Sequence, residues 1–164
     1  MDLIVRQQQA HWGDTVFPCA IGKGGILAHK QEGDGATPIG QFQFRHVMYR
    51  PDRVTALKTV LPISSITPAD GWCDAPTHPS YNKRVSLPFS ASHEVLWKDE
   101  HIYDIVVVIG HNDAPIIPGN GSAVFLHLAK EGYQSTQGCV ALSQEDMLHV
   151  LAEVDCASRL IIKG

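Results

Sequence analysis

The clearest pattern in the chain is a period-two alternation over residues 124–129 and again over residues 139–142. In each run the even-numbered positions are aliphatic, and the odd-numbered positions include one reactive side chain, His127 in the first and Cys139 in the second. Such alternation is typical of a strand with one face on a core. The segment 130–137 contains Gly132 and several polar residues, which predicts a loop. After this loop the second strand is expected to run antiparallel to the first.

If these two strands pair, an imidazole and a thiol lie side by side, as nucleophilic catalysis requires. The alternative is structural: a cysteine in an apolar strand is often a small core residue, and a histidine there is often a satisfied structural one. Gly138, directly before the cysteine, favours the catalytic interpretation because it leaves room for close approach of a substrate.

The remaining pattern predicts short strands and one helix. Strands are expected at 3–9 and 15–21 (joined through 11–14), around Phe42 and Phe44, at 58–67, at 105–109 and at 160–162. The β-branched run 105–109 is predicted to be a central strand buried on both faces. Residues 70–88 are predicted to form a long irregular loop that walls a binding cleft. Ser143 is expected to begin the helix, with Asp146 in a capping-box position. We predict a mainly β or α+β fold in a single domain, 1–164.

Composition narrows the function. The net charge is −4, hydrophobic residues make up 44% of the chain, and no Lys/Arg run occurs. We therefore expect neither nucleic-acid binding nor membrane insertion. The apolar run at the N-terminus is too short for a signal peptide. A cytoplasmic location is therefore expected if Met1 is the natural start.

Cysteine and histidine spacing argues against disulfides and metals. The four cysteines, at positions 19, 73, 139 and 156, form no C-x-x-C pair and are expected to be free thiols. None of the nine histidines has tight metal-ligand spacing, so we expect no metal and no cofactor. Cys73 is the one rival nucleophile, but the neighbouring Asp74 would oppose a thiolate.

A polar cluster, Gly110-His111-Asn112-Asp113, follows the central strand, where functional sites often lie. His111 is a candidate for substrate contact, and a surface turn residue is the alternative. Asn112 and Asp113 fit an Asx-type turn equally well.

Two motifs carry a family resemblance. One is His127, a loop, and then T-Q-G-C-V at 136–140; the other is T-P-I-G-Q-F at 37–42. With these motifs the chain, over roughly 15–145, resembles the L,D-transpeptidase catalytic domain family (YkuD-like). The resemblance implies a β-sandwich-like catalytic domain and a cysteine acyl-enzyme that acts on peptidoglycan stem tetrapeptides or muropeptides. A carbapenem adduct at Cys139 is expected on the same ground.

The chain departs from the family pattern in three places. Leu128 rather than Gly follows His127, the interval to Cys139 is short, and Gln137 and Ala141 stand where His and Arg are frequent. The missing Arg removes a charge-assisted contact that another cation must supply or that the substrate does not need. Candidate cations for substrate carboxylates are Arg45, Arg50, Arg53, Lys83 and Arg84.

The resemblance assigns roles to the residues around the cysteine. Cys139 is the nucleophile, His127 the general base, and the N–H groups of Gly138 and Cys139 the oxyanion donors. A backbone carbonyl, Ser135 or Thr136 would orient His127, and Ser135, Thr136 and Gln137 would contact substrate.

Three functions remain open from the sequence. We expect an L,D-carboxypeptidase that trims tetrapeptides during muropeptide recycling. The alternatives are an L,D-transpeptidase that forms 3-3 cross-links or exchanges D-amino acids, and a non-catalytic module that binds wall fragments.

Overall fold

The computed structural model describes residues 1–164 and is built on one large sheet. Its strands lie in the order β13 (Val140–Leu142), β12 (Phe125–Leu128), β11 (Ile105–Ile109), β6 (Gly40–Tyr49), β14 (Arg159–Lys163), β1 (Leu3–Arg6), β2 (Gln9–Trp12) and β3 (Thr15–Pro18), with β7 (Ile63–Ser65) paired to β6. A second sheet has the order β10 (His93–Val95), β8 (Asp70–Cys73) and β9 (Arg84–Ser86), and β4 (Ile26–Leu27) pairs with β5 (Thr37–Pro38). The fold is mainly β with one α-helix, as predicted.

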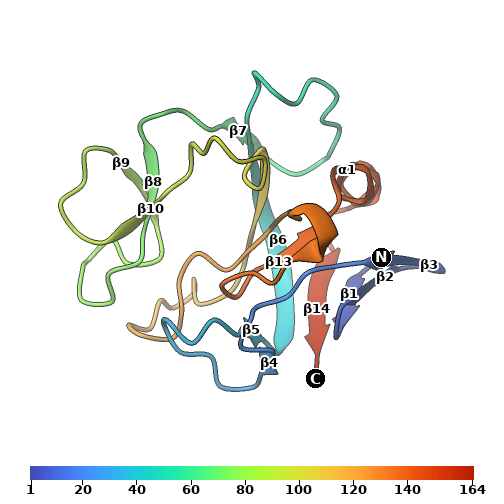
Figure 1. Ribbon diagram of the computed structural model, residues 1–164, viewed down its shortest axis with the longest axis horizontal. Coiled ribbons are helices and arrows are strands. Elements are labelled where there is room, and N and C mark those ends of the chain that lie inside the picture. Colours follow the sequence, from blue (N-terminus) through green and yellow to red (C-terminus); the bar gives the residue numbers. More distant parts are fainter.

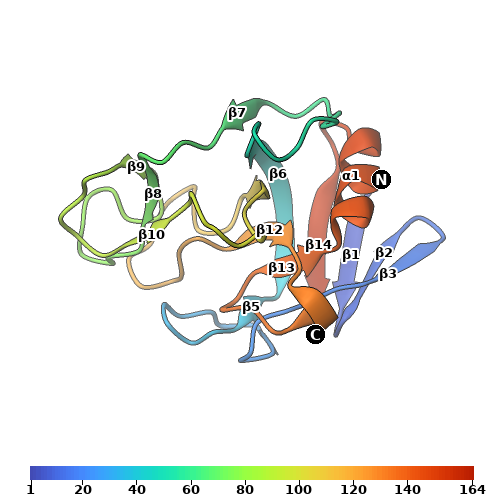
Figure 2. The ribbon, with the colours of Figure 1, turned by 45° about the horizontal axis from the view of Figure 1, so that its top comes forward.

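The central strand β11 separates two hydrophobic cores. In the first core its odd-numbered residues pack with α1 (Gln144–Glu153) and the N-terminal strands. In the second core, on the opposite face, Val106 and Val108 pack with Trp72, Leu96 and other residues. All five residues of β11 are buried, which confirms the prediction of a strand covered on both faces. Figure 1 and Figure 2 show the β8–β9–β10 sheet at the opposite end of the molecule from α1 and the N-terminal strands.

The N-terminal segment contains three strands, not two. His11 and Trp12 were expected in a connection, but they belong to β2, which pairs antiparallel with both β1 and β3. The first turn lies at Gln7-Gln8, where Gln7 has a φ of +53°. No Gly or Pro marks this turn, so the sequence pattern gave no sign that β1 and β2 are separate strands.

The segment 70–88 was expected to be irregular, and that prediction is wrong in part. It contains β8 and β9, which pair antiparallel and are joined by β10 into the small sheet. Strands of three or four residues are too short to show a clear alternation. The irregular portion is the connection between Asp74 and Lys83, together with Leu87 and Pro88 after β9.

The helix α1 (Gln144–Glu153) begins as predicted. Ser143 is the N-cap, and its Oγ accepts a hydrogen bond from the Asp146 backbone N–H at 3.1 Å. Met147, Val150 and Leu151 are buried against the first core. A short 3-10 helix, η1 (Glu131–Tyr133), lies in the loop between β12 and β13. No helix in the structure has the length and apolar character needed to cross a membrane.

The strands β12 and β13 pair directly, but they run parallel rather than antiparallel as predicted. The connecting segment does not turn back at once; it first bonds to the Ile21–Lys23 segment, which returns the chain to the end of the sheet where β12 began. His127 lies opposite Ala141 in the register. Because the side-chain period of two is independent of strand direction, the predicted faces are nevertheless correct.

Candidate active site

A pocket of about 440 Å³ opens between the large sheet and the β8–β9–β10 sheet, on the side of the second core. His127, Gly138 and Cys139 all line it. Of the segment 70–88, which was expected to wall the cleft, only Asp74 lines the pocket; His93 and Glu94 line it from β10, outside that segment. The pocket is the place where the predicted nucleophile and base meet.

His127 projects from β12 into this pocket and is 5% exposed. Its ring packs edge-on against Tyr103, with the ring centroids 5.3 Å apart. Nδ1 lies 2.9 Å from the Leu128 carbonyl oxygen, and because a carbonyl only accepts, Nδ1 carries the proton and Nε2 holds the lone pair. Burial lowers the pKa of His127 to about 4. The ring is therefore neutral at pH 7 and has an acceptor nitrogen free for a proton.

A backbone carbonyl thus orients the imidazole. This was one of three alternatives; Thr136 and Ser135 have other positions. Thr136 Oγ1 donates to the Cys139 carbonyl oxygen at 2.7 Å, and Ser135 is exposed at the pocket rim.

Cys139 precedes β13 and is 6% exposed. Its Sγ donates to the Ala123 carbonyl oxygen at 3.2 Å and accepts from the Phe125 N–H at 3.3 Å. Burial, together with the nearby Glu94 carboxylate, raises the pKa of the thiol to about 12. The resting cysteine is therefore a neutral thiol.

The thiol and the imidazole share the pocket without a hydrogen bond between them. The S–H is held by Ala123, so the pair rests in its uncharged form and is not an ion pair. In cysteine and serine enzymes such bonds often tighten only when substrate binds. The arrangement suits a base that removes the proton as the sulfur attacks.

The loop before the cysteine decides which N–H groups remain available. Gly138 N–H donates to Thr136 Oγ1 at 3.1 Å, whereas the Cys139 N–H has no acceptor. Of the two oxyanion donors expected from sequence, Cys139 N–H is free and Gly138 N–H is already engaged. Gly138 has a φ of +137°, and a Cβ placed there would lie 2.9 Å from the Ala36 carbonyl oxygen, so only glycine fits.

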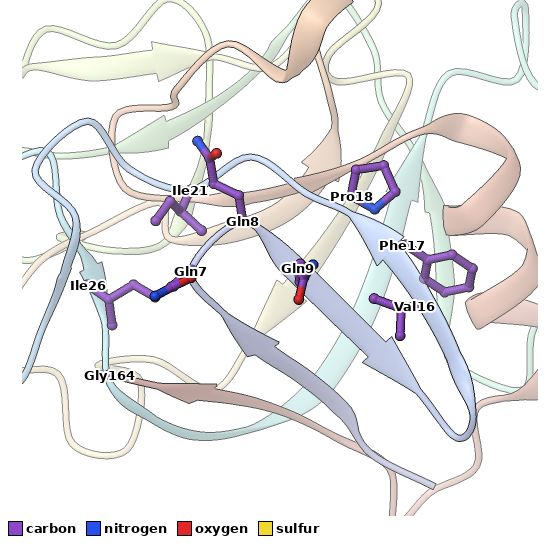
Figure 3. Close-up of a pocket in the computed structure, with 9 residues that line it drawn as sticks. All are labelled: Gln7, Gln8, Gln9, Val16, Phe17, Pro18, Ile21, Ile26 and Gly164. Atoms are coloured by element: carbon purple, nitrogen blue, oxygen red, sulfur yellow. The ribbon is translucent and has the colours of Figure 1, made fainter.

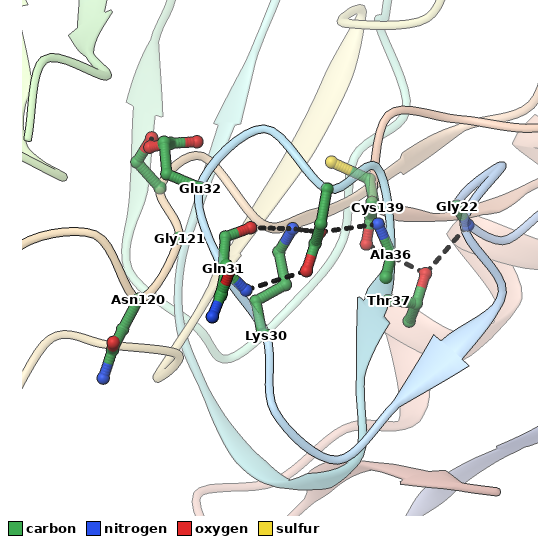
Figure 4. Close-up of polar contacts among 12 residues, drawn as sticks. Gly22, Lys30, Gln31, Glu32, Ala36, Thr37, Asn120, Gly121 and Cys139 are labelled. Carbon is green, nitrogen blue, oxygen red and sulfur yellow. Dashed lines mark hydrogen bonds and ion pairs between the residues drawn. The ribbon is translucent and has the colours of Figure 1, made fainter.

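The T-P-x-G motif supports this loop. Gly22 N–H donates to Thr37 Oγ1 at 2.8 Å, and Thr37 Oγ1 donates to the Gly138 carbonyl oxygen at 2.9 Å. Thr37 is fully buried, and Figure 4 shows it between Gly22 and the segment that carries Cys139. Thr37 and Gly138, which are 101 residues apart in sequence, thus join the two motifs into one hydrogen-bonded unit.

The structure separates His111 from the other predicted site residues. Thr136 and Gln137 line the pocket, but His111 does not. His111 Nε2 bonds to the Asn120 carbonyl oxygen at 3.1 Å, and its ring packs against Phe42. Asn112 has a structural role but not as the Asx-type turn expected: its Oδ1 accepts from the N–H of Ile117, five residues on, rather than from a residue two on.

The candidate cations are used elsewhere. Arg45, Arg50, Arg53 and Arg84 form ion pairs with Asp113, Asp52, Asp104 and Asp70, respectively, and Lys83 borders a different hollow. The cations that do line the pocket are Lys30, Lys98 and Lys130. Sequence reasoning missed them because each comes from a loop with no distinctive spacing.

Carboxylates line part of the same pocket. Glu94 accepts a hydrogen bond from the Tyr103 hydroxyl, and burial raises its pKa. Glu32 accepts from Tyr81 and Ser122, and Asp74 Oδ1 is buried without a hydrogen bond. The pocket therefore has anionic groups facing the small sheet and a cation, Lys30, beside the nucleophile.

A second hollow, of about 880 Å³, is larger but has no catalytic group. Figure 3 shows it at the β1–β2 turn and β3, lined by Gln7, Phe17, Ile26 and neighbouring residues. It lacks a thiol, a histidine and a carboxylate side chain. No group of three or more His, Cys, Asp or Glu side chains is arranged to hold a metal ion.

Comparison with known protein families decides the family. The model of the YkuD L,D-transpeptidase catalytic domain matches residues 3–162. The chain belongs to the YkuD family. Comparisons with curated proteins and with solved structures found no match. The family match extends beyond the 15–145 range expected from the motifs, because it includes β1 and β14, which lie side by side in the large sheet.

Membership assigns this YkuD domain to cysteine-dependent L,D-transpeptidases, whose substrates are peptidoglycan peptides. This agrees with the catalytic interpretation of the two alternating strands. The pocket that holds Cys139 and His127 is the candidate active site of this domain.

Proposed function

We propose that this YkuD domain is an L,D-carboxypeptidase that releases the terminal D-Ala from peptidoglycan stem tetrapeptides. The single observation that carries the proposal is the placement of Cys139 and His127 in one pocket, with a free Cys139 N–H beside the sulfur. These three groups supply a nucleophile, a base and an oxyanion donor.

The proposed reaction begins when substrate displaces the Cys139 S–H from Ala123 and brings it toward His127 Nε2. The sulfur attacks the carbonyl at the L-centre of the diamino acid while His127 takes the thiol proton. The oxyanion is held by the Cys139 N–H, a contact that contributes about 3 kcal/mol in comparable enzymes. The C–N bond then breaks as His127 returns the proton to the nitrogen, and D-Ala leaves as the free amine.

Water completes the cycle in this proposal. His127 takes a proton from water, and the resulting hydroxide attacks the thioester. The C–S bond then breaks as His127 returns the proton to the sulfur, which gives a tripeptide acid and the Cys139 thiol. The pocket volume of about 440 Å³ is near the lower end of the roughly 300–1,000 Å³ of small-molecule sites. Such a pocket favours one stem peptide and a water over two stem peptides at once.

The charges of the pocket support a diamino acid substrate. Glu32, Asp74 and Glu94 line the pocket, and their negative charge complements an ammonium group such as that at the end of a diaminopimelate side chain. We include a cytoplasmic location in the proposal, with soluble muropeptides as substrates. Detection of the protein in the soluble cytoplasmic fraction, by immunoblot of fractionated cells, tests that part.

The first prediction concerns turnover of a soluble tetrapeptide muropeptide, read by mass spectrometry. We expect loss of one alanine residue and no dimeric product. Cys139→Ala is expected to lower kcat/KM by at least about a thousandfold because the nucleophile is gone. His127→Gln is expected to lower it by about 10²–10⁴-fold through loss of the base.

Cys73→Ala is the matched control. Cys73 is fully buried in β8 and does not line the pocket, so its variant should retain turnover. A dimeric product would instead identify a cross-linking transpeptidase. Binding of the muropeptide without turnover by the wild type would identify a binding module.

A further inference from the structure

Lys30 is a buried cation beside the nucleophile. Its side chain is only 6% exposed, and it lines the pocket together with Cys139. Its Nζ lies 3.4 Å from the position that a Cβ on Gly138 would occupy, so the ammonium sits directly against the residue that precedes the cysteine. Figure 4 shows the side chain reaching from its own loop toward the segment with Ala36 and Cys139.

The protein fixes this ammonium in place without using all of its donors. Nζ donates to Asp34 Oδ1 at 2.5 Å and to the Gln31 carbonyl oxygen at 3.3 Å. An ammonium has three N–H groups, so one remains for a ligand. Asp34 is itself held by the N–H groups of Gln31 and Ala36.

The stem of Lys30 is also confined. A Cβ on Gly121 would lie 3.0 Å from Lys30 Cγ and 3.1 Å from Lys30 Cε, so the glycine makes room for the stem. The cation is therefore positioned before any substrate arrives, which lowers the entropy lost on binding.

Other cations of the pocket are less suited to the same task. Lys98 is 27% exposed and lies over the Tyr103 ring, 4.0 Å from Glu94. Lys130 is 48% exposed and pairs with Glu100 at 3.3 Å. Ala141, where the family pattern often has Arg, is fully buried opposite His127 and carries no charge. Lys30 supplies a positive charge next to the nucleophile from a different part of the chain.

We propose that Lys30 binds the α-carboxylate of the amino acid that leaves, and so selects peptides with a free C-terminus. This inference rests on the proposed function. When the scissile carbonyl reaches Cys139 Sγ, the terminal carboxylate lies only two bonds beyond the leaving nitrogen, next to the nucleophile loop. A carboxylate there meets the unused N–H of Lys30, and a charge-assisted hydrogen bond forms in a site with little water.

The consequence is exopeptidase specificity. A C-terminal amide has no charge for Lys30 to bind, and a longer peptide would extend past the terminal position into the ammonium. Hydrogen bonds to charged groups are worth about tenfold to hundredfold in a binding or rate constant. We expect the wild type to prefer the free acid by that factor.

The experiment compares two soluble substrates, the tetrapeptide muropeptide and its C-terminal D-alaninamide analogue, by kcat/KM. Lys30→Met keeps a long stem between Gly121 and Gly138 but removes the charge. It is expected to lose about tenfold to hundredfold on the acid and to change little on the amide, so that the preference disappears. Lys30→Arg should retain part of the preference.

Lys23→Met is the matched control. Lys23 lies on the neighbouring turn against Gly35, is exposed and does not line the pocket, so its variant should keep the full preference for the free acid.

An equal loss of kcat/KM on both substrates in Lys30→Met would overturn the proposal, because the cation would then serve a group that both substrates share. Equal turnover of acid and amide by the wild type would overturn it without any variant, and does not depend on whether Lys30→Met folds. Wild type that turns over neither substrate refutes the proposed function itself.

Discussion

His127 and Cys139 are each more than nine-tenths buried, and burial shifts their two pKa values in opposite directions. The pKa of the imidazole falls to about 4 and that of the thiol rises to about 12, because a charge is poorly solvated in either position. The gap makes a resting thiolate–imidazolium pair unfavourable. Proton transfer is therefore expected to occur only with substrate in place, when the acyl group takes up the developing charge.

This protonation state predicts how the cysteines react with iodoacetamide at pH 8. The thiolate is the reactive form, and a raised pKa leaves little of it. Cys156, the exposed cysteine, should be alkylated first, and Cys139 at least about a hundredfold more slowly. Peptide mass spectrometry of timed samples measures both rates.

Cys19 provides the internal control for that experiment. Burial also raises its pKa to about 12, so it should stay unlabelled in the folded protein and react after denaturation. Labelling of Cys139 as fast as Cys156 would contradict the neutral resting pair and indicate a thiolate held by His127.

At the scale of single elements, the strength of the local pattern decided what could be predicted from sequence. The strand β11 is a run of β-branched residues, β12 alternates strictly and α1 has an N-cap, so each was recognised. The strands β8, β9 and β10 have three or four residues, and their pairing depends on partners elsewhere in the chain. The direction of β13 was also missed, since it is set by backbone bonds to the Ile21–Lys23 segment rather than by its own residues.

The cap of α1 gives a prediction at this scale. Ser143 Oγ accepts from the Asp146 N–H and donates to Asp146 Oδ2 at 2.6 Å, directly after β13. Ser143→Ala should lower the free energy of unfolding by about 1 kcal/mol, measured by urea denaturation, because one helix N–H loses its acceptor. Turnover should be unchanged, since Ser143 does not line the pocket.

Ser143→Thr is the control for the cap, because threonine keeps the hydroxyl acceptor. It should retain most of the stability that the alanine variant loses. Equal stability of the alanine and wild-type proteins would show that the cap contributes nothing to α1.

Across the whole molecule, the active-site pocket is assembled from segments that are distant in sequence. Residues near 30–35, 74, 93–103, 122–127 and 134–139 all line it. His127 and Cys139 could be predicted from sequence because one lies on β12 and the other directly before the adjoining β13, in two runs with a visible alternation. Lys30 and Glu94 could not, since nothing local distinguishes them from surface charges. The packing of the small sheet against the large one brings Glu94 to the pocket, and the loop between β4 and β5 brings Lys30 there.

One residue, Asn82, joins the small sheet to the loops around the pocket. Its Oδ1 accepts from Trp72 Nε1 at 3.0 Å and from the Ala123 N–H at 3.1 Å. Its Nδ2 donates to the carbonyl oxygens of His111 and Asn112 at 3.2 and 2.8 Å. Ala123 is also the residue whose carbonyl holds the Cys139 S–H, so the amide is one residue removed from the nucleophile.

Asn82→Ala should therefore weaken both the fold and the site. Four polar groups, two of them buried and two partly buried, lose their partner, and alanine must adopt a φ near the +55° of Asn82. We therefore expect a loss of about 3 kcal/mol or more in the free energy of unfolding. Turnover should fall with it because Ala123 is no longer anchored. Asn82→Asp keeps the two acceptor contacts and loses the two donor contacts, so its stability should lie between that of the alanine variant and that of the wild type.

Asn120→Ala is the matched control, since the Asn120 side chain is exposed and forms no hydrogen bond. Its effect on the free energy of unfolding should stay within about 0.5 kcal/mol. Wild-type stability and turnover in Asn82→Ala would show that the small sheet is held to the pocket loops by its apolar contacts alone.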